Sequence, residues 1–186
     1  MSETKEQILK IRDLDITFQT TAGKVHAIRG VNIDLMKGET VAIVGESGSG
    51  KSVTMKAAMG ILASNANVTD GTIEFSYHHA DGTPETVDIL KKDKKWIRRH
   101  INGKRIAMVF QDPMTALNPT MTIGRQIEEA IKIHNPHIKR DALEKRVIEL
   151  MGLVGIDQAD ERRNLYPYHF SGGMRQRSVL AIALAG

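Results

Sequence analysis

The feature that most constrains the fold is a glycine-rich octapeptide, GESGSGKS, at residues 45–52. It follows TVAIV at residues 40–44, a short apolar and β-branched run that is typical of a strand buried on both faces. A helical pattern comes next, with Met55, Met59 and Leu62 spaced to share one face. A strand, a glycine-rich loop and a helix in this order predict an α/β domain that binds an anion at the start of the helix.

Each part of this loop suits the binding of phosphate. Gly45, Gly48 and Gly50 permit backbone conformations that a side chain forbids, so that successive N–H groups turn inward. These donors bind phosphate oxygens with help from the helix dipole. Lys51 adds a charge that reaches the terminal phosphates, and the Ser52 hydroxyl is a ligand for Mg²⁺. We therefore assign nucleoside triphosphate binding to the whole loop, which comprises Gly45, Glu46, Ser47, Gly48, Ser49, Gly50, Lys51 and Ser52.

The composition excludes several other kinds of chemistry. Cysteine is absent from the 186 residues, which excludes a disulfide scaffold, cysteine-ligated zinc, an iron–sulfur cluster and a cysteine nucleophile within them. The guanine-reading motif Asn-Lys-x-Asp is also absent, which disfavours a GTPase. The N-terminus is polar, unlike a secretory signal, and no apolar run reaches the roughly 20 residues that span a bilayer. We therefore expect a protein that does not cross a membrane by itself.

The remaining patterns predict a mixed fold. Alternating apolar residues indicate antiparallel strands before the loop, and residues 71–77 and 87–90 indicate a hairpin after it. A second buried strand is expected at residues 105–110, which with residues 40–44 predicts a mainly parallel sheet. Further expected elements are strands at 9–18 and 31–35, helices at 123–134 and 141–151, and a last helix that opens at Ser171 and still runs at Gly186.

One short segment accounts for the basic character of the chain. Residues 91–100, KKDKKWIRRH, hold six basic residues and one acidic residue, whereas the whole chain carries a net charge of +4. Such a run is consistent with a solvated helix face. It is also consistent with contact to an acidic partner or to a membrane surface, and Trp96 within the run does not decide between them.

A second candidate anion-binding device lies at residues 170–177, FSGGMRQR. Ser171 is of a residue type that caps helices, and Gly172 and Gly173 let a phosphate approach the backbone closely. Taken alone, the segment fits a capped helix after a loop equally well. The chain thus has two candidate anion-binding segments, at residues 45–52 and 170–177, which is more than a single phosphate group needs.

The motifs together resemble the ATP-binding cassette (ABC) family, in both order and spacing. The octapeptide corresponds to the Walker A motif, Gln111 in MVFQDP to the Q-loop, and SGGMRQR to the family signature. Residues 111–127 and SGGM in place of SGGQ resemble the oligopeptide, dipeptide and nickel importers. The resemblance implies a P-loop NTPase fold with a parallel core sheet. It places the antiparallel β subdomain and P-loop core in residues 1–110, the Q-loop and helical lobe in 111–170, and the signature helix in 171–186.

The resemblance also implies roles for single residues. Phe18 would stack on adenine, although a core aromatic is the alternative. Gln111 would contact Mg²⁺ and the attacking water, and a polar residue at a strand end is its alternative. Ser171, Gly172 and Gly173 would bind the γ-phosphate of ATP on a second subunit.

The family's function implies the partners. They are a second, identical or different, ATP-binding subunit, transmembrane permease subunits and, indirectly, an extracytoplasmic solute-binding protein, with no nucleic acid. The cofactors are ATP and Mg²⁺, and the expected location is the cytoplasmic face of the membrane. The implied activity is ATP hydrolysis that drives uptake of peptides or a related solute such as nickel.

The sequence stops at LAIALAG, before the positions where the family carries its Walker B aspartate and glutamate. We therefore assign no catalytic residue and expect a fragment that lacks the C-terminal part of the core and is inactive and poorly stable alone. Two other functions stay open. One is a cytosolic ABC-type ATPase that acts on DNA, although the insertions usual in those proteins are missing. The other is a truncated fragment that binds nucleotide without catalysis.

Overall fold

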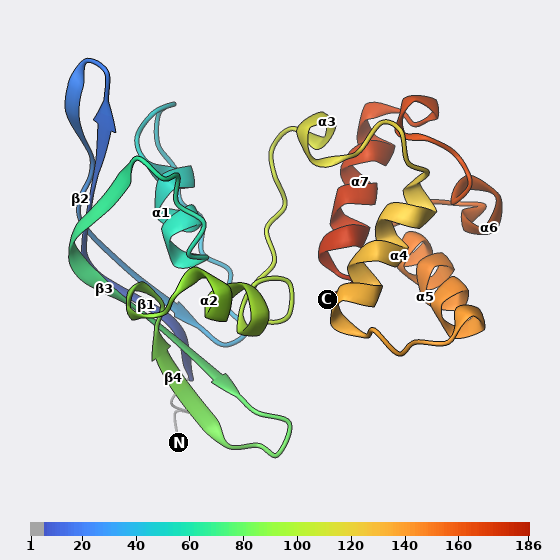
Figure 1. Cartoon of the computed structure of the whole chain (residues 1–186), viewed down its shortest axis with the longest axis horizontal. Coiled ribbons are helices and arrows are strands. Elements are labelled where there is room, and N and C mark those ends of the chain that lie inside the picture. Colours follow the sequence, from blue (N-terminus) through green and yellow to red (C-terminus); the bar gives the residue numbers. More distant parts are fainter. Residues whose placement is uncertain (1–5) are drawn as a thin grey trace. The chain divides into compact units, whose positions relative to one another are not determined.

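The computed structural model describes residues 6–186 and divides the chain into two compact units. Unit 1 ends at Ile101 and unit 2 begins at Asn102. Each unit is compact in itself and has its own core (Figure 1). Among the helices between residues 6 and 186, none combines the length and the apolar character that crossing a bilayer requires.

Unit 1 is built on an antiparallel sheet of four strands in the order β2-β1-β3-β4. This sheet confirms the early strands and the hairpin expected from the sequence. The last strand is shifted relative to the expected 87–90, because residues 89–91 form a 3₁₀ turn instead. The strands are β1 (Gln7–Thr20), β2 (Gly23–Met36), β3 (Ala66–His78) and β4 (Pro84–Asp88).

The core of unit 1 requires an irregularity in β1. Ile11 and Leu14 are both fully buried although they are three residues apart, which strict alternation would not allow. The pairing with β2 shifts between these two residues and the pairing with β3 shifts between Arg12 and Asp15, and Asp13 adopts a positive φ of 47° there. Gly71 of β3 faces this bulge, since a Cβ atom at Gly71 would lie 2.6 Å from the Cα atom of Leu14. The bulge therefore returns Leu14 to the buried face.

Asp15 of β1 connects its strand to both neighbouring strands through polar contacts. Its Oδ1 atom accepts a hydrogen bond from the Thr69 hydroxyl of β3 at 2.7 Å and lies 2.5 Å from Nε2 of His26 on β2. The hydrogen bond from Thr69, followed by the contact with His26, lowers the pKa of Asp15 below its ordinary value of 3.8. Asp15 therefore adds stability above pH 4, and this contribution is lost as the pH falls through the lowered pKa.

We expect Thr69→Val to raise the pKa of Asp15 toward 3.8, because the substitution removes the largest favourable contact of the carboxylate. An NMR pH titration of the Asp15 carboxyl carbon measures this shift. Thr86→Val is the control, because the Thr86 hydroxyl contacts Ser76 at 2.8 Å on another part of the sheet. An unchanged pKa in the Thr69 variant would contradict this account.

Two short helices accompany the sheet, α1 (Lys51–Ala58) and α2 (Lys94–His100). The segment that follows α1 approaches α2 closely at Gly60, where a Cβ atom would lie 2.6 Å from Cδ1 of Ile97. Met59 caps the C-terminus of α1, so Leu62 lies beyond the helix and does not extend its apolar face as the sequence suggested. Figure 1 shows α1 beside the sheet, directly after the loop that carries the glycine-rich octapeptide.

The two buried strands expected at residues 40–44 and 105–110 are not formed. Neither run belongs to any of the four strands, and the isolated bridge found within residues 6–186 is a parallel pair between Asn102 and Ile106. Val44 is 88% exposed and Phe110 43% exposed. A central strand requires a hydrogen-bonded neighbour at its side, and no strand within residues 6–186 provides one. The expected parallel sheet is therefore not present in the part of the chain that the structure describes.

Unit 2 is helical, and its core lies between α4, α5 and α7. The helices α4 and α5 confirm the expected helices at 123–134 and 141–151. The last helix ends at Ala183, where Leu184 caps it, and does not continue to Gly186 as expected. The helices are α3 (Pro113–Ala116), α4 (Ile123–His134), α5 (Arg140–Leu153), α6 (Ala159–Arg162) and α7 (Gly172–Ala183).

The segment between α3 and α4 is held by one buried side chain. Gln126 is 7% exposed; its Oε1 atom accepts from the Asn118 N–H at 2.9 Å, and its Nε2 atom donates to the carbonyls of Asn118 and Met121, both at 3.0 Å. All three hydrogen bonds satisfy backbone groups of the loop that follows α3. The loop conformation therefore depends on an amide at this position.

We expect Gln126→Ala to lower the free energy of unfolding of unit 2 by about 2–3 kcal/mol, because it removes the partner of the Asn118 N–H and of the Met121 carbonyl and one of two hydrogen bonds to the Asn118 carbonyl. Urea denaturation followed by circular dichroism measures the change. The control is Gln176→Ala, at a half-buried glutamine in α7 for which the structure shows no side-chain hydrogen bond among the described residues. Equal losses in the two variants would contradict the role assigned to Gln126.

Candidate nucleotide-binding site

The glycine-rich loop has the backbone conformation that its sequence predicts. Gly48 and Gly50 have φ angles of +85° and +92°, in the left-handed region that favours glycine. Gly50 has a second reason to lack a side chain, because a Cβ atom there would lie 2.4 Å from Cδ1 of Ile28 on β2. Gly50 therefore packs closely on the sheet of unit 1, whereas residues 45–49 of the loop are exposed.

The first turn of α1 follows the loop without a side-chain cap. Gly50 occupies the N-cap position, no side-chain hydrogen bond caps the helix, and the first turn has no acidic residue. The first backbone N–H that bonds within the helix is that of Thr54, which donates to the Gly50 carbonyl at 2.9 Å. The preceding N–H groups and the positive end of the helix dipole are thus suited to an anion.

Lys51 directs its ammonium group back over the loop. Nζ donates to the carbonyls of Gly45 and Glu46, both at 2.7 Å, and lies 3.3 Å from the Ser49 hydroxyl. These acceptors are neutral, whereas a phosphate oxygen is charged and forms a stronger hydrogen bond with an ammonium group. The geometry places the positive charge where an anion bound by the loop amides would meet it.

The other predicted residues of unit 1 are Ser52 and Phe18. Ser52 is exposed in the first turn of α1, next to Lys51, so its hydroxyl is accessible. Phe18 lies on β1, half-buried, opposite Val25. It follows Ile16 by two residues, and Ile28, the partner of Ile16, is the residue that contacts Gly50. Stacking of Phe18 on adenine stays a prediction.

Gln111 belongs to unit 2, at the bend before α3. Its side chain is exposed, and the next residue, Asp112, caps α3 by accepting a hydrogen bond from the Met114 N–H at 2.9 Å. The P-loop and Gln111 therefore lie in different units. The predicted contact of Gln111 with a metal ion stays a prediction.

The signature segment begins α7. Ser171 is the N-cap, and its Oγ atom accepts from the Met174 N–H at 3.4 Å, as the sequence predicts for a cap. Gly172 and Gly173 are exposed, and a Cβ atom at either position would meet nothing within 4 Å. The start of α7 is thus an open surface that a second molecule can reach, with no acidic residue in the first turn.

Arg175, which belongs to the signature segment, has a positioning role that was not predicted from the sequence. Arg175, in the first turns of α7, donates from Nε to the Pro167 carbonyl at 2.8 Å and from Nη2 to the Tyr168 carbonyl at 3.5 Å. These bonds fix the 3₁₀ turn at residues 167–169, which leads directly into Ser171. A charged residue four positions after a helix cap was the only signal of this positioning role.

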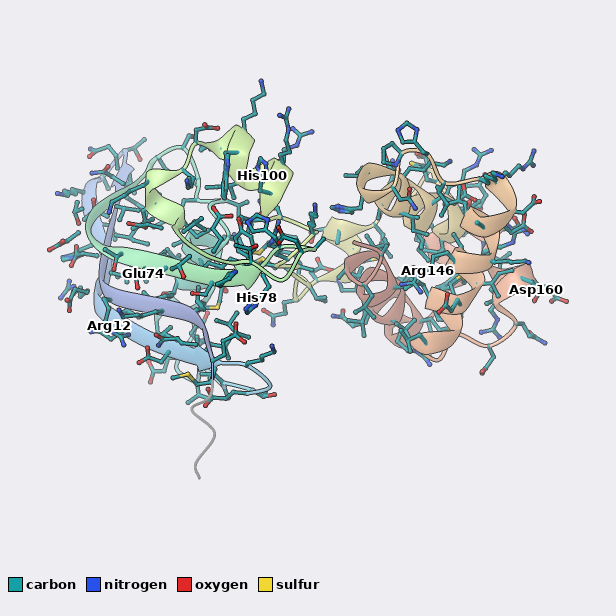
Figure 2. The ribbon with its side chains drawn as sticks, turned by 90° about the horizontal axis from the view of Figure 1, so that it is seen from below. Arg12, Glu74, His78, His100, Arg146 and Asp160 are labelled. Carbon is teal, nitrogen blue, oxygen red and sulfur yellow. The ribbon has the colours of Figure 1, made fainter. Side chains whose placement is uncertain are left out.

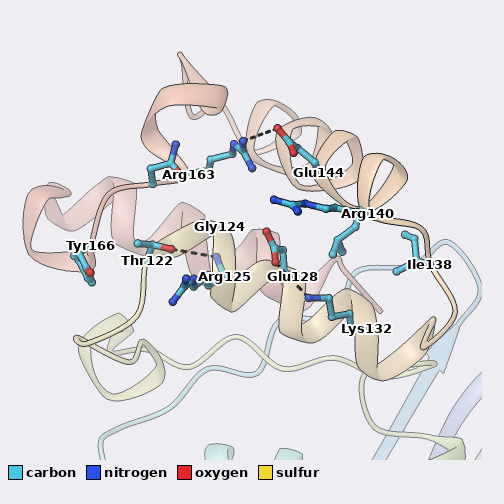
Figure 3. Close-up of a pocket in the computed structure, with 12 residues that line it drawn as sticks. Thr122, Gly124, Arg125, Glu128, Lys132, Ile138, Arg140, Glu144, Arg163 and Tyr166 are labelled. Carbon is cyan, nitrogen blue, oxygen red and sulfur yellow. Dashed lines mark hydrogen bonds and ion pairs between the residues drawn. The ribbon is translucent and has the colours of Figure 1, made fainter.

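A polar groove of about 720 Å³ lies elsewhere on unit 2, between α4, α5 and the segment after α6 (Figure 3). Two ion pairs border it, Arg163–Glu144 at 2.5 Å and Lys132–Glu128 at 3.4 Å. Arg140 also lines the groove. Thr122, Gly124 and Arg125 of the motif at residues 111–127 line the groove, but none of the residues predicted to bind nucleotide or metal does.

The loop, its lysine and serine, and the uncapped helix start together define a phosphate-binding loop of the kind found in nucleoside triphosphatases. The family model described as "ABC transporter" matches residues 16–186. The chain belongs to the ABC transporter family.

Relatives with 44–48% identity agree with this assignment. The chain is 48% identical to the dipeptide transport ATP-binding protein DppD of Lactococcus lactis subsp. cremoris over 97% of this chain and 49% of the relative. It is also 48% identical to the oligopeptide transport ATP-binding protein OppD of Bacillus subtilis, over 96% of this chain and 47% of the relative. The chain thus spans about half the length of the curated relatives that it matches.

A solved structure shows the same fold. The dimeric structure of MJ0796, described as a bacterial ABC transporter cassette, superposes with a TM-score of 0.76 at 24% sequence identity. The match covers 96% of this chain and 69% of MJ0796. It confirms the expected fold class, an α/β ABC cassette with an antiparallel β subdomain and a helical lobe.

Proposed function

We propose that the chain is part of an ATP-binding subunit of an ABC importer, with a nucleotide held at residues 45–52. The observation that carries the proposal is the loop itself. Its glycines adopt left-handed conformations, its lysine turns inward, and the helix behind it begins without a cap. These features favour a polyphosphate over a single carboxylate, because the uncapped N–H groups at the start of α1 and the Lys51 ammonium group belong to the same loop and can bind several oxygens.

The proposed cofactors are ATP and Mg²⁺. Backbone amides from Gly45 to Gly50, together with Lys51, would hold the phosphates. The Ser52 hydroxyl and the Gln111 side-chain carbonyl are hard oxygen ligands of the type that Mg²⁺ prefers, and phosphate and water oxygens commonly complete its shell. The donor chemistry of the residues present thus fits the ion. When bound, Mg²⁺ would neutralise charge on the phosphates.

We propose that the start of α7 completes the site of a second ATP-binding subunit. The open surface over Gly172 and Gly173 supports this, because a phosphate on another molecule could approach these amides closely. Arg175 supports it as well, since its bonds to residues 167 and 168 hold the turn that presents Ser171. Bound ATP would then bridge two subunits, and loss of its γ-phosphate on hydrolysis would release the bridge.

The importer assignment draws on the relatives, whose names describe dipeptide and oligopeptide transport. We propose peptides or a related small solute such as nickel as the cargo, permease subunits as membrane partners and an extracytoplasmic solute-binding protein as an indirect partner. The proposed location is peripheral, on the cytoplasmic face of the membrane. ATP hydrolysis by the assembled subunits would drive uptake.

Affinity purification of the tagged protein from the membranes of its own cells tests this function. We expect integral-membrane permease subunits to co-purify and nucleic acid to be absent. DNA binding with a steep dependence on salt, together with the absence of permease subunits, would instead indicate an ABC-type ATPase that acts on DNA.

The Ser171→Arg variant tests the proposed role of the start of α7. We expect this variant to retain nucleotide binding and to lose ATP-dependent association with a second subunit.

A further inference from the structure

The basic run at residues 91–100 forms a surface that nucleotide binding does not use. Its second half is α2 in unit 1, and Figure 2 shows long side chains extending from this helix away from the sheet, near the labelled His100. The run contains six lysine and arginine residues and one aspartate, and the rest of the chain holds 20 basic and 21 acidic residues. The positive charge of this protein is thus concentrated on one short surface, which we call the α2 surface.

The cations of the α2 surface are not neutralised by the protein. The structure gives four exposed side chains no ion-pair partner within residues 6–186. Asp93, the one acidic residue of the run, is occupied as the N-cap of α2 and accepts from the Trp96 N–H at 2.8 Å. Within residues 6–186, Lys91 forms a salt bridge with Asp88 at 3.1 Å, and Lys92 interacts electrostatically with Glu85. The four unpaired cations are Lys94, Lys95, Arg98 and Arg99.

An aromatic row lies along one flank of the helix. The Trp96 and His100 rings stack with centroids 4.6 Å apart, and the Lys92 ammonium lies 4.7 Å from the centroid of the Trp96 ring. Trp96 is half-buried, so part of its ring reaches the surface. A half-exposed indole beside cations is the combination that favours the boundary between water and lipid headgroups.

The opposite face of α2 fixes the helix to unit 1. Ile97 is 3% exposed and Ile101 fully buried, and Ile97 is also the residue that contacts Gly60. The apolar face of α2 therefore packs against unit 1, and the cations of the helix lie on its exposed side. Such a surface can meet a flat partner without a change in the fold.

We propose that the α2 surface binds the headgroups of an anionic phospholipid bilayer. Two of the four unpaired cations are lysines, which act as compact point charges and need only a dense negative surface rather than a carboxylate at a fixed place. A headgroup layer accommodates both the cations and the half-buried indole, because it presents dense negative charge beside an apolar boundary. This inference goes beyond the proposed function and does not depend on ATP hydrolysis.

Trp96 is the single tryptophan among the 186 residues and therefore reports directly on the α2 surface. We expect its fluorescence to shift to shorter wavelength, and to become protected from acrylamide, when the chain is mixed with vesicles that contain phosphatidylglycerol. Vesicles of phosphatidylcholine alone should have no effect. Raising the salt concentration from 0.1 M to 1 M should weaken binding at least ~10-fold, because the Debye length falls from about 10 Å to about 3 Å.

The decisive comparison uses two variants with the same change in charge. One replaces Lys94, Lys95, Arg98 and Arg99 by glutamine, and the control replaces Lys24, Arg29, Lys139 and Arg140, which are also exposed. In vesicle flotation we expect the first variant to lose at least ~100-fold in affinity, since each cation near an anionic surface contributes several-fold, and the control to lose little. Circular dichroism verifies that both variants are folded.

Three results would overturn the proposal. The first is an equal loss of vesicle affinity in the two variants, which would show that only net charge matters. The second is vesicle binding that leaves Trp96 fluorescence and acrylamide access unchanged. The third is tight binding to polyglutamate without binding to anionic vesicles, which would assign the surface to an acidic protein instead.

Discussion

Replacing Lys51 by alanine should abolish nucleotide binding. We expect the dissociation constant for Mg-ATP to rise at least ~100-fold, because charge-assisted hydrogen bonds to a phosphate are among the strongest that a side chain forms and each 1.4 kcal/mol is a factor of ten. The Lys51 ammonium is already positioned over the loop by the carbonyls of Gly45 and Glu46. Titration with a fluorescent ATP analogue measures the change.

The control for this substitution is Lys56→Ala. Lys56 lies in the last turn of the same helix, so the variant loses the same charge at the end of α1 that is remote from the loop. We expect its affinity for Mg-ATP to stay within ~3-fold of the original, since Lys56 is placed at the far end of α1 and, among the described residues, forms no side-chain hydrogen bond with the loop. Comparable weakening by both substitutions would show that the helix charge, and not the loop, binds the nucleotide.

Replacing Gly71 by alanine should produce the largest loss of stability. Gly71 has a φ of +100°, and a Cβ atom there would lie 2.6 Å from the Arg12 carbonyl oxygen and from the Leu14 Cα atom, and 2.7 Å from the Asp13 carbonyl oxygen. These are backbone atoms of β1, so the clash cannot be relieved by turning a side chain. We expect the free energy of unfolding of unit 1 to fall by about 3–5 kcal/mol, measured by urea denaturation.

Gly82→Ala separates the two causes of this loss. Gly82 has a similar φ of +84° in the turn between β3 and β4, but a Cβ atom there would meet nothing within 4 Å. Its substitution should cost only the conformational strain, about 1–2 kcal/mol. If the two glycine variants were equally unstable, the close approach of β3 to the bulge of β1 would play no part in the fold.

The local features of the site could be predicted from sequence because each depends on a few neighbouring residues. Gly48 and Gly50 adopt positive φ angles that their residue type alone favours. Ser171 caps α7 because a hydroxyl can accept from an N–H three residues ahead, a geometry that requires no tertiary contact. The hairpin of β3 and β4 follows equally from alternation and a polar turn.

The features that were not predicted depend on contacts between distant parts of the chain. The run at residues 40–44 has the composition of a central strand, yet strand formation needs a hydrogen-bonded neighbour, and the four strands of unit 1 pair only with one another. The role of Gln126 depends on loop carbonyls five and eight residues away in sequence, which no periodicity marks. The bulge at Asp13 could not be predicted, because it is defined by the pairing of β1 with both neighbouring strands.

An NMR titration of the ¹⁵N-labelled chain with Mg²⁺ and a non-hydrolysable ATP analogue tests most directly whether the loop around Lys51 holds a nucleotide. We predict saturable shifts of the Gly48, Gly50 and Lys51 amide resonances, with Gly82 unaffected as the internal reference. Shifts confined to residues outside 45–52, or none at saturating nucleotide, would contradict the assignment of this loop as the phosphate-binding site.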